Sequence, residues 1–149
     1  KETAEILCKK NKIITNKYLK EIDYGDAEGL DLKTFNKKYS FILKLWKKGK
    51  DPKFPNGESS FDVLKRLKNF IKIELCSKKI KANKNILVFT HNVMLRCLIG
   101  DNFKIDKTQW FKINIKYFDI LEFRIKKNKL LANIDRDKYL SIFKNFYYD

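Results

Sequence analysis

Apolar side chains recur at helical spacing in two stretches of the chain. The first predicts an amphipathic helix over residues 32–48, and its apolar face is made by Leu32, Phe35, Tyr39, Ile42, Leu43 and Trp46. A second, longer helix is expected to begin at Ser59, because Asp62 follows three positions later in the pattern of a capping box. Its apolar face is predicted to consist of Phe61, Leu64, Leu67, Ile71 and Leu75.

The remaining stretches carry shorter patterns. An unbroken apolar run over 86–90 predicts a buried strand, and it leads directly into a short helix ended by Gly100. The tail over 108–135 alternates as strands do, with "KKNK" as a hairpin turn, and a last helix is predicted over 137–147. Residues 3–10 resemble the last turns of a helix, and 12–23 suit a short strand or an extended connection.

Helices that alternate with strands favour an α/β fold, here a three-layer α/β/α sandwich around a mostly parallel sheet. The 149 residues are enough for one ordinary core and few for two, so a single domain over 1–149 is expected. No stretch is long and apolar enough to suggest a membrane span, and the start lacks the layout of a signal peptide, which favours a cytoplasmic protein. The three cysteines are scattered and no histidines cluster, so neither a disulfide framework nor a zinc site is predicted, and no cofactor is expected.

The formal net charge of +16 brings anionic partners into consideration. Only four basic residues are arginines, however, and the lysines are spread over nearly every segment. This distribution weakens both a nucleic acid and an anionic membrane surface as partners, and a solvated lysine surface explains it better than a specific nucleic-acid footprint. Neither a specific nucleic acid nor a membrane is therefore expected as a partner. Lysines between positions 44 and 53 could draw an anionic substrate by their field, but a solvated helix face explains them equally well and is preferred.

The only histidine in the chain, His91, follows the apolar run directly and precedes the short helix. In α/β sheets ligands bind at the carboxyl ends of strands, and the first amides of the following helix are ready anion donors. Position alone leaves His91 open to a structural role as well as a catalytic one.

Four short stretches resemble, in order and spacing, the histidine phosphatase superfamily of phosphoglycerate-mutase-like proteins. They are "TAE" (residues 3–5), "LKEIDYGDAEG" (19–29), "PNGESSFDVLKR" (55–66) and "ILVFTHN" (86–92). Any one of them is weak alone, and the resemblance rests on four in register over residues 1 to about 100. It implies phosphoryl transfer through a phosphohistidine, with a small phosphorylated metabolite as the substrate, and it implies a phosphoglycerate-mutase-like sandwich.

The resemblance also implies roles for particular residues. His91 matches the second histidine of the family site, and Glu21 matches its general acid and base. Asn92 and Thr3 are expected on the phosphate-binding side, although Asn92 stands where glycine is common. Ala27 stands where an aromatic side chain is common. The turn Gly57–Glu58–Ser59 and the helix residue Arg66 match family positions for which a structural role is expected.

One departure from the family pattern matters more than the others. The chain contains no Arg-His-Gly, the motif that carries the nucleophilic histidine of the family. We therefore expect that residues 1–149 lack the first strand or strands of the domain, and that the nucleophile lies outside them. The interpretation favoured for the whole protein is a phosphomonoesterase, because the gap between Gly29 and Gly57 is short for a mutase. A phosphoglycerate mutase and, in another class, a non-catalytic basic binding module remain as alternatives.

Overall fold

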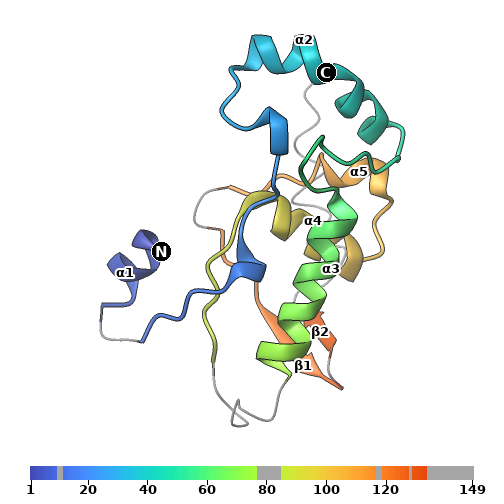
Figure 1. Ribbon diagram of the computed structural model, residues 1–149. Helices are drawn as coiled ribbons and strands as arrows, with labels where there is room; N and C mark the ends of the chain where they lie inside the picture. The colour runs from blue at the N-terminus through green and yellow to red at the C-terminus, as the bar shows by residue number, and fades with distance from the viewer. Residues whose placement is uncertain (10–11, 77–84, 117–118, 128, 134–149) are drawn as a thin grey trace.

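Helices α3 and α4 pack side by side and carry much of the buried core. The computed structural model describes residues 1–9, 12–76, 85–116, 119–127 and 129–133 (Figure 1). The helical elements in these ranges are α1 (Glu2–Leu7), η1 (Lys17–Leu19), η2 (Gly25–Ala27), α2 (Leu32–Lys47), α3 (Ser60–Phe70), the π-helical turn η3 (Ile71–Leu75), α4 (Asn92–Asn102) and α5 (Lys107–Trp110). The strands are β1 (Phe123–Lys126) and β2 (Lys129–Ala132).

The two amphipathic helices predicted from sequence are confirmed, although Leu32, predicted on the apolar face of the first, is 75% exposed at its start. Asp31 caps α2 by accepting a hydrogen bond from the Thr34 backbone N–H at 3.0 Å. Ser59 and Asp62 form the predicted capping box at the start of α3, since each side chain accepts from the other residue's backbone N–H. The predicted apolar face of α3 was wrong at one position, because Phe61 is 60% exposed. Its core face is instead made by Val63, Leu64, Leu67 and Phe70.

Phe54 joins α2 to this core. Its side chain is buried in the loop between α2 and α3 and meets two rings edge-on, Tyr24 at 5.1 Å and Trp46 at 5.4 Å between centroids. Ile42 of α2 is fully buried in the same cluster. Edge-to-face pairs add to the stability that area burial alone provides. The aromatic contacts therefore fix α2 against the segment that contains Glu21.

Helix α4 does not end at Gly100, contrary to the prediction. The helix continues to Asn102, and Lys104 adopts the left-handed conformation (φ 54°) that closes it, with the Ile105 N–H donating to the Gly100 carbonyl at 3.0 Å. Gly100 serves close packing instead, since a Cβ there would lie 2.3 Å from the Trp110 indole. The sequence pattern showed a glycine near the helix end and could not reveal the tryptophan beside it.

The hairpin predicted around "KKNK" is present, whereas the mostly parallel sheet is not seen in the described ranges. Strands β1 and β2 pair antiparallel, with Phe123 opposite Ala132. The tail was wrongly predicted to begin as a strand at 108, because Asp106 accepts a hydrogen bond from the Thr108 backbone N–H and caps α5. The helix predicted over 137–147 lies outside the described residues.

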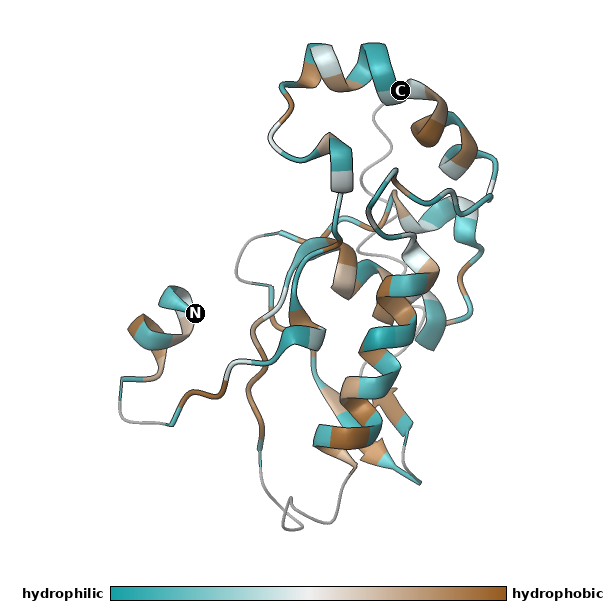
Figure 2. Cartoon of the chain, in the orientation of Figure 1, coloured by the Kyte–Doolittle hydropathy of each residue, from teal (hydrophilic) through white to brown (hydrophobic). Residues whose placement is uncertain are grey.

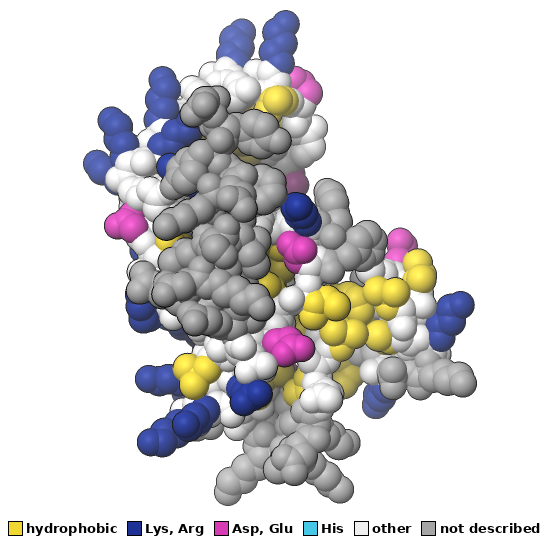
Figure 3. Space-filling view, turned by 180° about the vertical axis from the view of Figure 1, so that it is seen from behind, with side chains coloured by type: hydrophobic (Ala, Val, Ile, Leu, Met, Phe, Trp, Pro, Cys, Tyr) yellow, Lys and Arg dark blue, Asp and Glu magenta, His cyan; other side chains and the backbone are white. Residues whose placement is uncertain are grey.

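The run predicted as a buried strand, 86–90, is extended but forms no strand with any described residue. Ile86, Leu87 and Val88 are between 37% and 62% exposed. Figure 2 shows the hydrophobic colouring of this segment, and Figure 3 shows apolar side chains gathered on the side of the molecule that bears it and α1. A strand requires a hydrogen-bonded neighbour, which the apolar sequence alone cannot supply. The three-layer sandwich is therefore not established by the described residues, which hold helices and one small sheet.

Two glycines allow the loop after Glu21 to touch the loop before α3. Gly25 has φ 52°, and a Cβ on it would lie 2.1 Å from the Pro55 carbonyl oxygen. A Cβ on Gly57 would lie 2.4 Å from the Asp23 carbonyl oxygen. The two backbones are thus closer than any side chain permits, and both motifs need glycine at these positions.

This contact predicts a difference between two glycine substitutions. Gly25→Ala should lower the free energy of unfolding by about 3 kcal/mol or more, since it adds a clash with backbone to an unfavourable φ. Gly29→Ala is the matched control, because Gly29 also has positive φ (70°) but a Cβ on it would meet no atom within 4 Å. It should cost about 1 kcal/mol. Urea unfolding measures both, and equal losses would show that the close approach is unimportant.

Candidate active site

Glu21 and His91 both lie at the beginning of α4. His91 is the N-cap residue of this helix, with extended backbone (φ −117°, ψ 169°), and its side chain is exposed. The Glu21 carboxylate accepts a hydrogen bond from the Ile22 backbone N–H at 2.9 Å and a long one from the Val93 backbone N–H at 3.5 Å. A carboxylate at a helix N-terminus is favoured by the free amides and the helix dipole. The structure therefore places Glu21 beside the first turn of the helix that His91 begins.

Arg66 holds the Glu21 segment in place from α3. Its guanidinium binds both carboxylate oxygens of Glu58, at 2.9 and 3.0 Å. The same group donates to three backbone carbonyls, those of Tyr18 (2.8 Å), Lys20 (2.7 Å) and Glu21 (2.9 Å). Only 14% of the Arg66 side chain is exposed. A planar, five-donor cation suits this task, and a lysine cannot reproduce it.

Glu58 extends this clamp to the residues after Glu21. Its backbone N–H donates to the Asp23 carbonyl at 2.8 Å, and its side chain accepts from the Asp23 N–H at 3.1 Å. The Gly-Glu-Ser turn thus binds the Glu21 loop through backbone, through the Glu58 carboxylate, and through the close glycine contact. The contacts of Arg66 and Glu58 are those of positioning residues.

The segment before His91 is tied to the same loop. The Thr90 hydroxyl donates to the Leu19 carbonyl at 3.0 Å. On the other side of His91, the exposed Asn92 side chain donates to the Ile115 carbonyl at 3.2 Å. Both anchors use backbone acceptors from distant parts of the chain. They position the helix start on which His91 and Asn92 sit.

Thr3 is not brought to this place in the structure. It lies exposed on α1, and Figure 1 shows α1 standing apart from α4. Three of the four site residues proposed from sequence, Glu21, His91 and Asn92, therefore share one end of α4, and the fourth does not join them.

Arg96, on the first turns of α4, is a charged residue near the site that the sequence interpretation missed. Its Nε is buried and has no hydrogen-bond partner among the described residues. Burial lowers the pKa of Arg96, and the nearby Tyr24 and Glu21 oppose that effect. Burial also raises the pKa of Tyr24, and Glu21 adds to the increase. The clue in the sequence was an arginine inside the otherwise apolar "VMLRCLIG", where its helical position faces the core.

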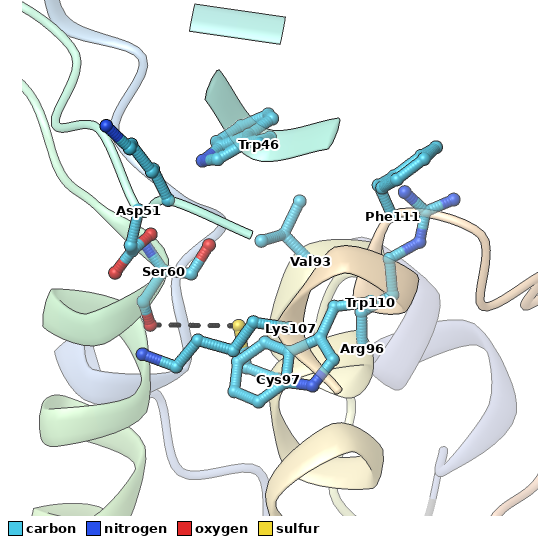
Figure 4. A pocket seen from close by; sticks show the side chains of 10 residues that line it. Trp46, Asp51, Ser60, Val93, Arg96, Cys97, Lys107, Trp110 and Phe111 are labelled. Carbon is cyan, nitrogen blue, oxygen red and sulfur yellow. Dashed lines mark hydrogen bonds between the residues drawn. The ribbon is translucent and has the colours of Figure 1, made fainter. Parts of the chain in front are cut away.

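Arg96 lines a small pocket of about 50 Å³ between α2, α4 and α5 (Figure 4). Trp46 contributes a second buried N–H without a partner among the described residues. Asp51 also lines the pocket, and its carboxylate already accepts hydrogen bonds from the Ser60 and Phe61 backbone amides at the start of α3. Cys97 is held as a thiol, since burial raises its pKa to about 12. The pocket can thus receive a hydrogen-bond acceptor, and its Cys97 thiol is not activated as a nucleophile.

The described residues contain neither a candidate metal cluster nor a helix that could span a membrane. No group of three or more His, Cys, Asp or Glu side chains in them is arranged to hold a metal ion. Among the helices of these ranges, none has the length and apolar character needed to cross a bilayer.

Comparison with known proteins identifies the family. The model of the histidine phosphatase superfamily (branch 1) matches residues 1–134, and the chain belongs to this superfamily, whose fold is α/β. The chain is 29% identical over 104 residues to a 2,3-bisphosphoglycerate-dependent phosphoglycerate mutase of Parvibaculum lavamentivorans, and 33% identical over 89 residues to a phosphoglycerate mutase of Schizosaccharomyces pombe. It is 29% identical over 124 residues to a fructose-2,6-bisphosphatase of Saccharomyces cerevisiae.

These alignments cover 69%, 59% and 79% of this chain, respectively. They cover 49%, 42% and 26% of the three relatives. The chain thus spans less than half the length of each of these curated proteins.

The Arg66 clamp predicts that its replacement by lysine is costly. Arg66→Lys should lower the free energy of unfolding by about 3 kcal/mol, because it removes the guanidinium donors to Glu58 and to three carbonyls. Arg124→Lys, on the exposed part of β1, is the matched control and should change stability by less than about 0.5 kcal/mol. Denaturant unfolding of both variants provides the comparison. A loss at Arg66 as small as that at Arg124 would contradict the clamp.

Proposed function

We propose that the whole protein is a phosphoryl-transfer enzyme, most simply a phosphomonoesterase that works through a phosphohistidine and acts on a small phosphorylated metabolite. The observation that carries this proposal is the placement of the Glu21 carboxylate at the Val93 amide, two residues after His91. Membership of the histidine phosphatase superfamily supports it.

His91 and the first turn of α4 are proposed to bind the transferring phosphoryl group. This group carries negative charge spread over its oxygens, and positioned donors and cations stabilise it. The start of α4 carries donors of this kind. They are the exposed His91 side chain, the Asn92 amide group and the first backbone N–H groups of the helix. Thr3 is proposed to reach the phosphate from α1 in the whole protein.

Glu21 is proposed to be the general acid and base. The departing oxygen of an alkyl phosphate needs a proton, and the water that releases the phosphohistidine must lose one. Glu21 is half-buried and close to His91 along the start of α4, so it can serve a group bound there. Arg66 contributes by holding the Glu21 backbone and does not touch the substrate.

The phosphorylated histidine itself is proposed to lie outside residues 1–149, because His91 is the only histidine in them and the reaction in this family uses two. The same proposal accounts for the apolar segment 86–90. A neighbouring strand from elsewhere in the protein would cover Ile86, Leu87 and Val88 and complete a three-layer α/β/α sandwich with a mostly parallel sheet.

A phosphoglycerate mutase is the second candidate, and two of the relatives carry that name. The short stretch between Gly29 and Gly57 favours the phosphatase, as does the similarity to a bisphosphatase over 79% of the chain. In another class, a basic binding module without catalysis would account for the charge of +16 but leaves the Glu21–His91 arrangement without a purpose.

In the complete protein, the proposed roles predict that the effect of replacing Glu21 depends on the leaving group and that the effect of replacing His91 does not. Glu21→Gln should reduce kcat/KM by roughly 10²- to 10⁴-fold on an alkyl phosphate and much less on a nitrophenyl phosphate, whose leaving group departs without a proton. His91→Ala should reduce both alike, since it removes a donor to the phosphoryl group common to both substrates. The values of kcat/KM are measured under conditions in which formation of the phosphoenzyme limits the rate.

Glu122→Gln serves as the control for Glu21→Gln, because Glu122 is exposed and, in the part of the chain that the structure describes, its carboxylate bonds to the Asn133 side chain alone. Equal losses for Glu21→Gln on both substrates would rule out its role as general acid. Asp23, Asp26 and Glu28 would then be the carboxylates to test.

A further prediction concerns the nucleophile. Residues 1–149 produced alone should form no phosphoenzyme with a phosphorylated substrate, because the proposed nucleophile is not among them. Acid-labile, base-stable labelling is measured by mass spectrometry on this fragment and on the complete protein. Phosphorylation of His91 in the fragment would overturn its assignment as the second histidine.

A further inference from the structure

The outward face of α2 carries a stripe of lysines with a phenylalanine in its middle. Lys33, Lys37, Phe41, Lys44 and Lys48 follow one another at intervals of three or four residues, which places them on one side of the helix. All five are exposed, and Phe41 is 51% exposed. A large aromatic ring is therefore held in water between cationic neighbours.

The opposite face of α2 fixes this orientation. Ile42 is fully buried, and Phe35, Tyr39 and Trp46 pack against the core. The helix cannot rotate to bury Phe41 without losing those contacts. The exposure of Phe41 is thus a consequence of the fold and not of a loose side chain.

The charge of this face is uncompensated within the described part of the chain. No acidic residue occurs between Asp31 and Asp51. The segment between them contains Lys33, Lys37, Lys38, Lys44, Lys47, Lys48 and Lys50. None of these forms an ion pair with a described residue, whereas Lys53, Lys68 and Lys104 do. Figure 3 shows basic side chains projecting from the end of the molecule where α2 lies in Figure 1.

We propose that this face of α2 binds the surface of a membrane rich in anionic phospholipid, with Phe41 entering the headgroup region. Clusters of four to eight lysines on an amphipathic helix are the pattern that anionic lipid surfaces attract. The partner is a lipid surface and not a nucleic acid for two reasons. The helix has no arginine for contacts to bases, and the stripe has one aromatic side chain where successive bases would need several.

This proposal is independent of the proposed function. Its residues lie on the outward face of α2, while Glu21 and His91 lie at the start of α4. Binding here would bring the protein to a surface without using any group assigned to phosphoryl transfer. The two proposals can therefore fail separately.

Co-sedimentation of the full-length protein with phosphatidylcholine vesicles, with and without phosphatidylserine, tests the proposal. Binding should require phosphatidylserine and weaken with salt. Lys37→Glu with Lys44→Glu should reduce it by at least about 30-fold. Phe41→Ser should reduce it by about 10-fold, because the ring no longer leaves water.

The matched control is Lys126→Glu with Lys129→Glu, which makes the same change of net charge at exposed positions of the β1–β2 hairpin. It should weaken binding by less than about threefold, since charges beyond a Debye length are screened. Far-UV circular dichroism verifies that each variant folds.

Three outcomes would overturn the proposal. They are the absence of binding to vesicles that contain phosphatidylserine, an equal loss in the hairpin variant, and full retention of binding in the double α2 variant. Tighter binding to a single-stranded RNA, abolished by the α2 variant and unchanged in Phe41→Ser, would assign this face to nucleic acid instead.

Discussion

The arrangement at the start of α4 depends on one largely buried cation. Arg66 reaches from α3 to the carboxylate of Glu58 and to three backbone carbonyls, those of Glu21 and of two residues before it, and its side chain is only 14% exposed. Carbonyls removed from water need donors, and Lys20 and Glu21 lie in no helix or strand that could supply them. Arg66 supplies them from a single group. The position of Glu21 is therefore set by a side chain on another helix.

This constraint links three of the four sequence motifs of the family. Arg66 connects the third motif to the second, and the close contact of Gly25 with the Pro55–Gly57 backbone connects them again. Thr90 ties the fourth motif to Leu19 at the beginning of the second. Motifs separated by tens of residues thus contact one another through backbone acceptors. This explains why the sequence resemblance to the family consists of short matches that are far apart in the chain. The first motif stands apart, because α1 is not next to α4 in the described structure.

The elements that could be predicted from sequence are those whose causes are local. Both long helices follow from apolar spacing and caps, and the hairpin follows from alternation around a turn. The errors arise where the cause lies elsewhere in the chain. Gly100 faces Trp110, and Phe61 of α3 points to water although it continues the apolar spacing.

The site was predictable to a similar extent. The motifs indicated Glu21, His91 and Asn92, which share one end of α4, but they gave no reason to choose Arg96, whose burial depends on α2 and α5 packing over it. A strand over 86–90 was expected from an apolar run, yet pairing depends on a neighbour that the run does not specify.

A double-mutant cycle on the complete protein tests most directly whether Arg66 serves phosphoryl transfer through Glu21. The quantity is kcat/KM on an alkyl phosphate for the unchanged protein, Arg66→Lys, Glu21→Gln and the double variant. If Arg66 acts by placing Glu21, the double variant loses no more than Glu21→Gln alone, within about twofold. Losses that multiply would contradict this account and give Arg66 a role of its own.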